Sequence, residues 1–179
     1  MKKLKIKVLP SEHFDDRIEG AVIDTLIIHS MHDPEAEDCF SLHSCKTCLD
    51  RHTVSVHYII DLDGQVWQLV PEEKCAWHAG PSKMPATADG RERVNQFSIG
   101  IELVGSEDTD FAEAQYRSLV LLTVEIMTRH NITNILGHAD IAPDRKTDPW
   151  GFDWKRFRKD TLAFAKAGTQ IKFPPNALT

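Results

Sequence analysis

The sequence contains no apolar run of about 18 residues, the length that a membrane-spanning helix requires. Nor does it begin with a secretory signal peptide, because the residues after Met1-Lys2-Lys3 read LKIKVLPSEHFDD and contain no apolar core. We therefore expect no membrane partner. The protein is expected to be cytoplasmic, or to be released by a route other than a cleaved signal.

The sequence also has fewer positive than negative residues. It contains 21 Lys and Arg residues and 27 Asp and Glu residues, which gives a formal net charge of -6. This balance argues against nucleic acid or an anionic membrane as the main partner. Cysteine occurs four times, and reduced thiols are expected in a cytoplasmic chain. There is no internal repeat, and a chain of 179 residues predicts one domain, residues 1–179, with a substantial core.

Hydrophobic patterning predicts strands alternating with helices. The expected strands are residues 4–9, 23–28, 53–60, 65–70, 97–104 and 132–136, with residues 53–70 forming a hairpin around Asp63-Gly64. The expected helices cover about residues 40–49, a segment capped by Asp110 and ending near 130, and a segment capped by Asp153, with Phe164 among its buried side chains. This order predicts an α/β (α+β) fold in which a mixed central sheet is flanked by helices.

The segment GHADIAPDRKTDPW, residues 137–150, concentrates metal-binding side chains in a proline-containing loop after a short apolar strand. We interpret His138 and Asp148 as two zinc ligands, and His29, which follows the apolar run 23–28, as the third. A catalytic zinc needs three protein ligands and one open position. The alternative is a hydrogen-bonded loop histidine and a helix-capping aspartate.

Six segments together resemble one family, and they occur in that family's order across most of residues 22–160. They are IIHS at 27–30, VSVHYIIDLDG at 54–64, AWHAG at 76–80, GRERVNQFSIGIELVG at 90–105, GHADIAPDRKTDP at 137–149 and FDWKRF at 152–157. The chain resembles the type 2 N-acetylmuramoyl-L-alanine amidases, zinc enzymes that share a fold with the peptidoglycan recognition proteins. Within them it is most similar to the cytoplasmic 1,6-anhydro-N-acetylmuramyl-L-alanine amidases of the AmpD type.

The resemblance implies a zinc amidase of cell-wall recycling, which cleaves the amide between muramic acid, in its 1,6-anhydro form, and L-alanine of a muropeptide. It implies that His29, His138 and Asp148 hold Zn²⁺. Glu102 would be the catalytic carboxylate, and Lys146 would stabilise the oxyanion. Such roles suit a carboxylate beside a metal-activated water and a nearby cation. From the residues alone, an edge-strand glutamate and a solvated lysine are the alternatives.

The resemblance also suggests substrate contacts. Arg93 matches a position near the acidic end of the substrate peptide, and Trp77 is a candidate sugar or peptide contact. Ser30 adjoins the first ligand and stands where the AmpD type has asparagine. Thr53 and Trp150 also depart from that pattern, replacing arginine and glycine. The departures bear on preference for the anhydro sugar and leave the metal chemistry intact. His57 and His78 are interpreted as structural or cleft-lining.

Two other functions remain open: a lysin that attacks intact peptidoglycan, and a module that binds muropeptide without cleaving it. All five residues implied in catalysis are present, which favours an enzyme. The chain is expected to act as a monomer. The segment with Cys39, His43, Cys45 and Cys48 has no counterpart in the family pattern. It could hold a structural zinc or a redox-sensitive disulfide, or simply contain separate thiols.

Overall fold

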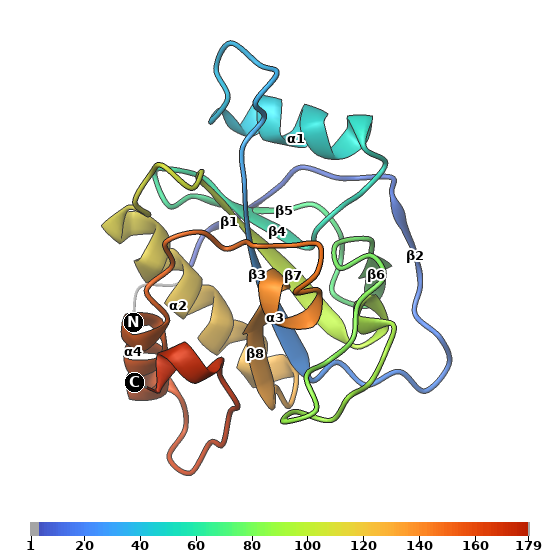
Figure 1. The fold of residues 1–179 in the computed structure, drawn as a ribbon, viewed down its shortest axis with the longest axis vertical. Coiled ribbons are helices and arrows are strands. Elements are labelled where there is room, and N and C mark those ends of the chain that lie inside the picture. Colours follow the sequence, from blue (N-terminus) through green and yellow to red (C-terminus); the bar gives the residue numbers. More distant parts are fainter. Residues whose placement is uncertain (1–3, 179) are drawn as a thin grey trace.

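The computed structural model describes residues 4–178, and its centre is a six-stranded sheet with the order β1-β5-β4-β7-β3-β8 (Figure 1). The strands are β1 (Ile6–Val8), β3 (Thr25–Met31), β4 (Tyr58–Ile60), β5 (Val66–Gln68), β7 (Ser98–Val104) and β8 (Asn134–Gly137). Only the β4–β5 pair is antiparallel within this sheet; the other neighbours are parallel. A second, two-stranded antiparallel sheet pairs β2 (Phe14–Asp16) with β6 (Lys74–Ala76).

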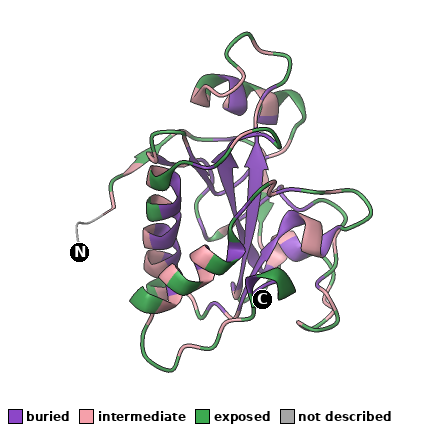
Figure 2. Cartoon of the chain, turned by 60° about the vertical axis from the view of Figure 1, so that its left-hand side comes forward, coloured by how far each residue is buried: buried purple, intermediate pink, exposed green. Residues whose placement is uncertain are grey.

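Helices lie on both sides of the central sheet, which confirms the predicted fold class (Figures 1 and 2). The helices are α1 (Leu42–Arg51), α2 (Glu113–Arg129), α3 (His138–Ile141) and α4 (Trp154–Phe164), with short 3-10 turns η1 (Val94–Gln96) and η2 (Pro175–Ala177). Helix α2 covers one face and α3 lies against the other (Figure 2). Within residues 4–178, no helix combines the length and apolar character needed to cross a bilayer.

Strand β7 divides its side chains between the two faces as the alternation predicts. Ile99, Ile101 and Leu103 belong to the largest buried cluster, which they share with apolar side chains of α2 and α4. Glu102 therefore points to the opposite face, away from these helices. Because the helices seal one face, the other face is the one available for a site.

The predicted hairpin is present, although its strands are shorter than predicted, residues 58–60 and 66–68. Its turn requires glycine at position 64. Gly64 has a φ of 77°, in the left-handed region, and a Cβ there would lie 2.5 Å from the carbonyl oxygen of Ala114. The short pair β2–β6 was not predicted, because three-residue strands carry too little periodicity to be recognised.

Two predicted details of the helices are wrong. Helix α2 begins at Glu113, not at Asp110, and its first turn is closed by Gln115, whose Oε1 accepts the backbone N–H of Ala112 at 2.9 Å. The start is delayed because Phe111 first packs into the core. In α4, Phe164 is 51% exposed, since it is the last residue of the helix.

A buried ion cluster centred on Glu72 yields a prediction about stability. The Glu72 carboxylate accepts hydrogen bonds from Tyr58, Arg129 and His130 at 2.7–3.1 Å. Burial alone would raise the pKa of Glu72, but these hydrogen bonds outweigh it and lower the pKa to about 2. A depressed pKa stabilises the folded state above the unfolded-state value of roughly 4.3, and that stabilisation is lost as the pH falls towards 2.

The Glu72→Gln variant is therefore expected to be less stable than the parent protein near pH 7, by on the order of 2 kcal/mol. The difference should shrink as the pH is lowered from about 5 to 2. Urea denaturation at several pH values measures it. A difference between the two proteins that stays constant over this range would contradict the assigned role of the carboxylate charge.

Candidate active site

Two adjacent parallel strands place a histidine beside a carboxylate. His29 in β3 is in register with Glu102 in β7, so both side chains leave the same face of the sheet. Strand β3 continues beyond the predicted strand 23–28 to Met31, because its pairing with β7 continues to Val104. His29 consequently lies within a strand, and both His29 and Glu102 are buried.

The second histidine, His138, directly follows strand β8. Gly137 at the end of β8 pairs with Ile28, so the next residue, His138, lies beside His29. His138 is also the first residue of α3, within the segment expected to be a loop. The carboxylate of Asp140 accepts the backbone N–H of Gly137 at 2.7 Å and thereby caps the turn.

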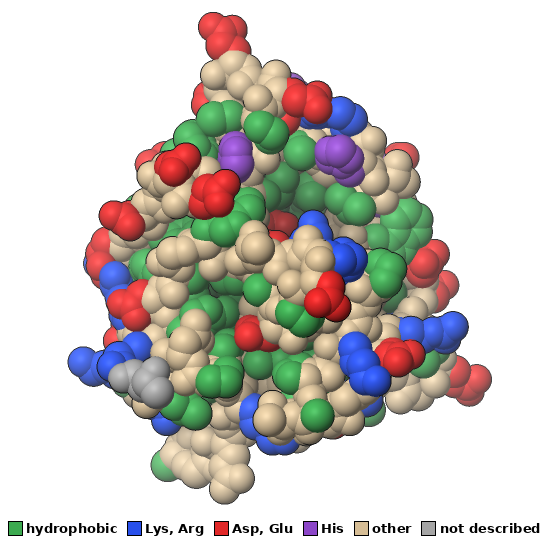
Figure 3. Space-filling model, in the orientation of Figure 1, with side chains coloured by type: hydrophobic (Ala, Val, Ile, Leu, Met, Phe, Trp, Pro, Cys, Tyr) green, Lys and Arg blue, Asp and Glu red, His purple; other side chains and the backbone are tan. Residues whose placement is uncertain are grey.

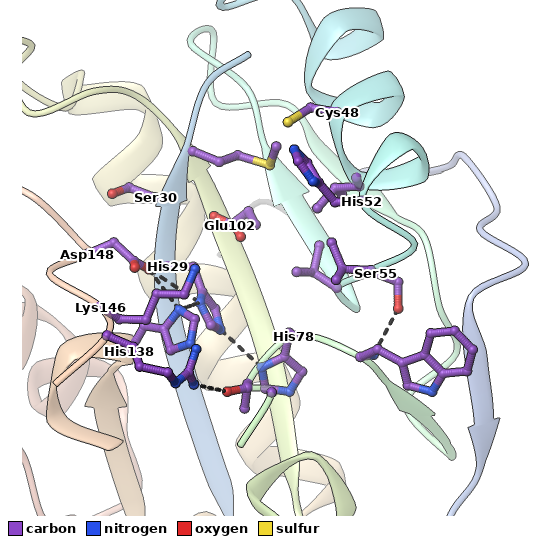
Figure 4. Close-up of a pocket in the computed structure, with 18 of the residues that line it drawn as sticks. His29, Ser30, Cys48, His52, Ser55, His78, Glu102, His138, Lys146 and Asp148 are labelled. Carbon is purple, nitrogen blue, oxygen red and sulfur yellow. Dashed lines mark hydrogen bonds and ion pairs between the residues drawn. The ribbon is translucent and has the colours of Figure 1, made fainter. Parts of the chain in front are cut away.

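The chain then returns to bring Asp148 to the two histidines. The backbone carbonyl of Asp148 accepts the N–H of Ala139 at 2.9 Å, which closes the loop between them. The Nδ1 atoms of His29 and His138 lie 3.0 Å apart (Figure 4). Asp148 Oδ2 is 3.2 Å from His138 Nδ1 and 3.4 Å from His29 Nδ1. Three ligand atoms thus converge on one point.

This geometry fits a zinc ion. Ligand atoms at about 2.0–2.2 Å from a tetrahedral zinc lie roughly 3.3 Å from one another, and two imidazole nitrogens with one carboxylate oxygen is a ligand set of catalytic zinc sites. In the described part of the chain, this is the one group of three or more such side chains arranged to hold a metal ion. The four cysteines are free thiols in this structure.

The protonation states also suit a metal. Burial lowers the pKa of His29 to about 4, so the ring is neutral at pH 7. Burial would raise the pKa of Asp148, but the close contacts of its carboxylate with the His138 and His29 rings outweigh burial and hold the pKa below its usual range. Burial likewise lowers the pKa of His78, next to His29. Neutral imidazole and ionised carboxylate are the forms that bind metal ions.

Glu102 differs from Asp148 in its surroundings. Burial, and then the negative charge of Asp148, raise the pKa of Glu102 well above its ordinary value, while Lys146 acts in the opposite direction. Its Oε2 atom is buried and has no hydrogen-bond partner among the described residues. A carboxylate oxygen of this kind, beside a metal site, is available to a water molecule or a substrate.

A cavity of about 730 Å³ opens above these groups, and His29, Glu102, His138 and Asp148 all line it. On the surface it forms a hollow, bordered by histidines on the side towards α1 and by Lys and Arg side chains elsewhere on its rim (Figure 3). A cavity of this size accommodates a small ligand. The candidate metal site therefore lies within a pocket that a substrate can enter.

The structure brings three further predicted residues to this cavity: Ser30, Trp77 and Lys146 line its wall. The Ser30 hydroxyl accepts the backbone N–H of Trp150 at 3.2 Å, and the Trp77 indole donates to Asp15 at 2.8 Å. These bonds limit the motion of both side chains.

Arg93 lies elsewhere. Its side chain is exposed and lines a neighbouring groove, which touches the main cavity at Gly80 and Arg145. Its backbone is left-handed, with a φ of 61°. Arg93 is therefore not part of the cavity that contains Glu102, although the two depressions adjoin.

Sequence reasoning did not single out the cavity wall that α1 contributes. Cys48 and His52, at the end of that helix, line the cavity opposite the metal cluster (Figure 4). Cys48 belongs to the Cys and His segment noted in the sequence, but nothing in that segment pointed to a cavity wall, and no motif marks His52. His78 was assigned a structural or cleft-lining role, yet its Nδ1 lies 3.0 Å from Nε2 of His29. Its position in the AWHAG segment was the available signal.

Comparison with known proteins gives one family. The model of the family Amidase_2, N-acetylmuramoyl-L-alanine amidase, matches residues 19–151. The 1,6-anhydro-N-acetylmuramyl-L-alanine amidase AmpD of Citrobacter freundii is 39% identical over 166 residues, covering 84% of this chain and 87% of that protein. The AmpD protein of Escherichia coli strain K12 is also 39% identical over 166 residues, covering 84% and 88%.

Solved structures of AmpD and AmiD amidases have a fold similar to that of this chain. A crystal structure of a selenomethionine AmpD derivative superposes with a TM-score of 0.73 and 36% identity, covering 93% of this chain and 96% of that one. The E. coli amidase AmiD, in complex with anhydro-N-acetylmuramic acid-L-Ala-D-gamma-Glu-L-Lys, superposes with a TM-score of 0.63 and 30% identity, covering 84% and 66%.

Proposed function

Because this chain belongs to the N-acetylmuramoyl-L-alanine amidase family, we propose that it uses zinc to release peptide from soluble cell-wall fragments. The bond cleaved is the amide between the lactyl group of 1,6-anhydro-N-acetylmuramic acid and L-alanine. The observation that carries the proposal is the convergence of His29, His138 and Asp148 beside Glu102, at the floor of one cavity. This is the arrangement that metal-assisted hydrolysis of an amide needs.

His29, His138 and Asp148 would hold the zinc through Nδ1, Nδ1 and Oδ2, the three atoms that converge. When bound, zinc supplies Lewis acidity, which makes water a stronger nucleophile near neutral pH and polarises the substrate carbonyl. The chain itself shields the floor of the cavity from bulk water, because the two imidazoles and both carboxylates are buried.

Glu102 would move the proton. Its unpaired Oε2 accepts the proton from the attacking water and then delivers it to the amide nitrogen, so that L-alanine leaves as an amine. A raised pKa suits both halves of this transfer, because the group must first accept and then release the proton. Lys146, on the cavity wall, would face the oxyanion that develops on the carbonyl.

The substrate assignment is supported by the AmpD relatives, whose names specify the 1,6-anhydro sugar and which match the chain over most of both lengths. The AmiD complex contains an anhydro-muropeptide. Within the cavity, Trp77 and Ser30 would contact the sugar or peptide. Arg93 would reach the acidic end of the peptide only if it extends into the neighbouring groove. We place the activity in the cytoplasm, in a monomer whose residues 1–179 form one zinc amidase domain.

The first test incubates the purified protein with anhydro-muramyl tripeptide and follows release of free peptide, with and without a zinc chelator. We expect release that the chelator abolishes and that added zinc restores. Release that is unaffected after complete removal of metal would contradict the zinc chemistry.

A second arm uses insoluble sacculi as substrate. Release from sacculi but not from the soluble tripeptide, by protein shown to contain zinc, would replace the recycling function with that of a lysin. Binding of the tripeptide without release from either substrate would instead identify a recognition module. Zinc content is measured in the same sample, so that an unloaded protein is not mistaken for an inactive one.

A further inference from the structure

We propose that His78 is a positioning residue, which holds the His29 ring in the one tautomer that presents an Nδ1 lone pair to the zinc. The proposal rests on the proposed function for its metal. His78 lies outside the ligand cluster, and Figure 4 shows its ring meeting His29 on the side away from Asp148. The two rings meet edge to face, with an interplanar angle of 84°.

A chain of buried hydrogen bonds extends from His29 to a backbone carbonyl. His29 Nε2 lies 3.0 Å from His78 Nδ1, His78 Nε2 lies 3.1 Å from the Ser98 hydroxyl, and that hydroxyl lies 2.6 Å from the carbonyl oxygen of Val94. All three side chains are buried, and His29 and Ser98 are almost completely so. Each imidazole, when neutral, donates through one nitrogen and accepts through the other.

The Val94 carbonyl oxygen can only accept a hydrogen bond. It therefore fixes which atom donates and which accepts in every hydrogen bond of this series. Two oxygens 2.6 Å apart need a hydrogen between them, so the Ser98 hydroxyl donates to Val94. Ser98 Oγ must then accept from Nε2–H of His78. His78 Nδ1 is left as an acceptor, and His29 donates to it through Nε2–H. The remaining nitrogen of His29, Nδ1, carries the lone pair and points at the metal position.

The opposite direction would have His29 donate through Nδ1, either to His138 Nδ1 at 3.0 Å or to Asp148 Oδ2 at 3.4 Å, the second of which is beyond the usual length of an N–H···O hydrogen bond. It would also reverse every bond in the chain and leave two oxygens 2.6 Å apart without a hydrogen between them. The geometry therefore favours the metal-binding tautomer. A histidine that binds a metal commonly donates the N–H of its other ring nitrogen to an oxygen. Here the acceptor is the imidazole of His78.

The fold is built around the His78 ring. A Cβ atom at Gly100 would lie 2.5 Å from Cγ of His78, so glycine in the middle of β7 leaves the space that the ring occupies. From the other side, Asn95 Oδ1 accepts the backbone N–H groups of His78 and Ala79 at 3.3 and 2.8 Å. Backbone, ring and hydrogen-bond partners are thus all held in place.

The test compares two replacements of similar size, His78→Gln and His78→Met. Glutamine can accept from His29 and donate to Ser98, whereas methionine fills the space but offers no comparable acceptor. We expect His78→Met to lower zinc affinity roughly 10- to 100-fold, and His78→Gln to remain within about 3-fold of the parent protein. Affinity is measured by competition with a chromophoric chelator.

Ser98→Ala removes the link that orients His78 and touches neither ligand nor substrate. It should lower zinc affinity by roughly 3- to 10-fold. Long-range ¹⁵N–¹H spectra of the metal-free parent protein should show His29 protonated at Nε2, and this preference should weaken in Ser98→Ala and His78→Met. His57→Met is the matched control, because His57 is equally enclosed but bonds to no ligand histidine. Its zinc affinity should be unchanged.

The outcomes separate the two proposals. If the parent protein binds no zinc, the proposed function fails, and the role of His78 fails with it. If the parent binds zinc and His78→Met binds it as tightly, only the positioning role is overturned. The positioning role is also overturned if His78→Gln, His78→Met and His57→Met lose affinity in proportion to their loss of thermal stability, because packing alone would then explain the effect.

Discussion

Replacing Glu102 by glutamine is expected to lower kcat by roughly 100- to 10,000-fold, the range that a general acid–base group contributes. Glutamine has nearly the same shape but cannot take a proton from water at neutral pH. Glu102 is buried, is in register with His29 and carries an unpaired oxygen, so glutamine keeps the position of the side chain but loses the proton acceptor. Steady-state kinetics with anhydro-muramyl tripeptide measures the change.

The Glu102→Gln variant should retain its zinc and a KM within a few-fold of the parent value, because Glu102 is not among the three converging ligand atoms. Glu72→Gln is the matched control: it also neutralises a buried glutamate, but one that lies outside the cavity. Full turnover by Glu102→Gln would contradict the assignment of Glu102 as the proton carrier. Loss of zinc from the variant would instead make Glu102 a part of the metal site.

The second large effect is expected for Asp148→Asn. The change replaces the one anionic ligand atom with a neutral amide and leaves two buried imidazoles. Because outer partners of a metal site already contribute 10- to 100-fold to affinity, loss of a ligand should lower zinc affinity by more than about 100-fold. Peptide release at limiting zinc should fall in parallel. Chelator competition and single-turnover assays measure the two quantities.

Asp140→Asn is the matched control for this change, since Asp140 belongs to the same segment but its carboxylate caps Gly137. Asparagine can also cap a helix, so both stability and zinc affinity should change little. If Asp148→Asn bound zinc as tightly as the parent while remaining folded, the carboxylate would not be a ligand, and the site would need a different third group.

Local patterns were sufficient wherever one segment decides its own structure. The alternation of side chains along residues 98–104 predicts that Glu102 lies on the face opposite Ile101, and the structure agrees. Asp63-Gly64 located the hairpin turn, and Asp153 located the start of α4, where its side chain accepts the N–H of Arg156 at 2.9 Å. The start of α2 was missed because the choice between Asp110 and Ala112 depends on where Phe111 packs, which no local pattern contains.

The candidate site was likewise predicted in part from the sequence, while the rest of it depends on the folded chain. Residue types in the segment 137–150 pointed to the metal candidates, and the resemblance to the amidase family added Glu102. The distances among His29, His138 and Asp148 depend on strands β3 and β8 pairing and on the loop closing between Ala139 and Asp148. Those contacts join residues up to 119 positions apart, so only the folded chain decides them.

The sequence by itself thus determined the fold class and the face of β7 that Glu102 occupies, and its resemblance to the amidase family pointed to the candidate groups. Tertiary structure alone decided three further features: the roof that α1 adds to the cavity, the separation of Arg93 into its own groove, and the bond from His78 to His29. The physical reason is that side-chain chemistry and strand alternation are properties of a segment. A cavity wall or a hydrogen bond between loops exists only once distant segments pack together.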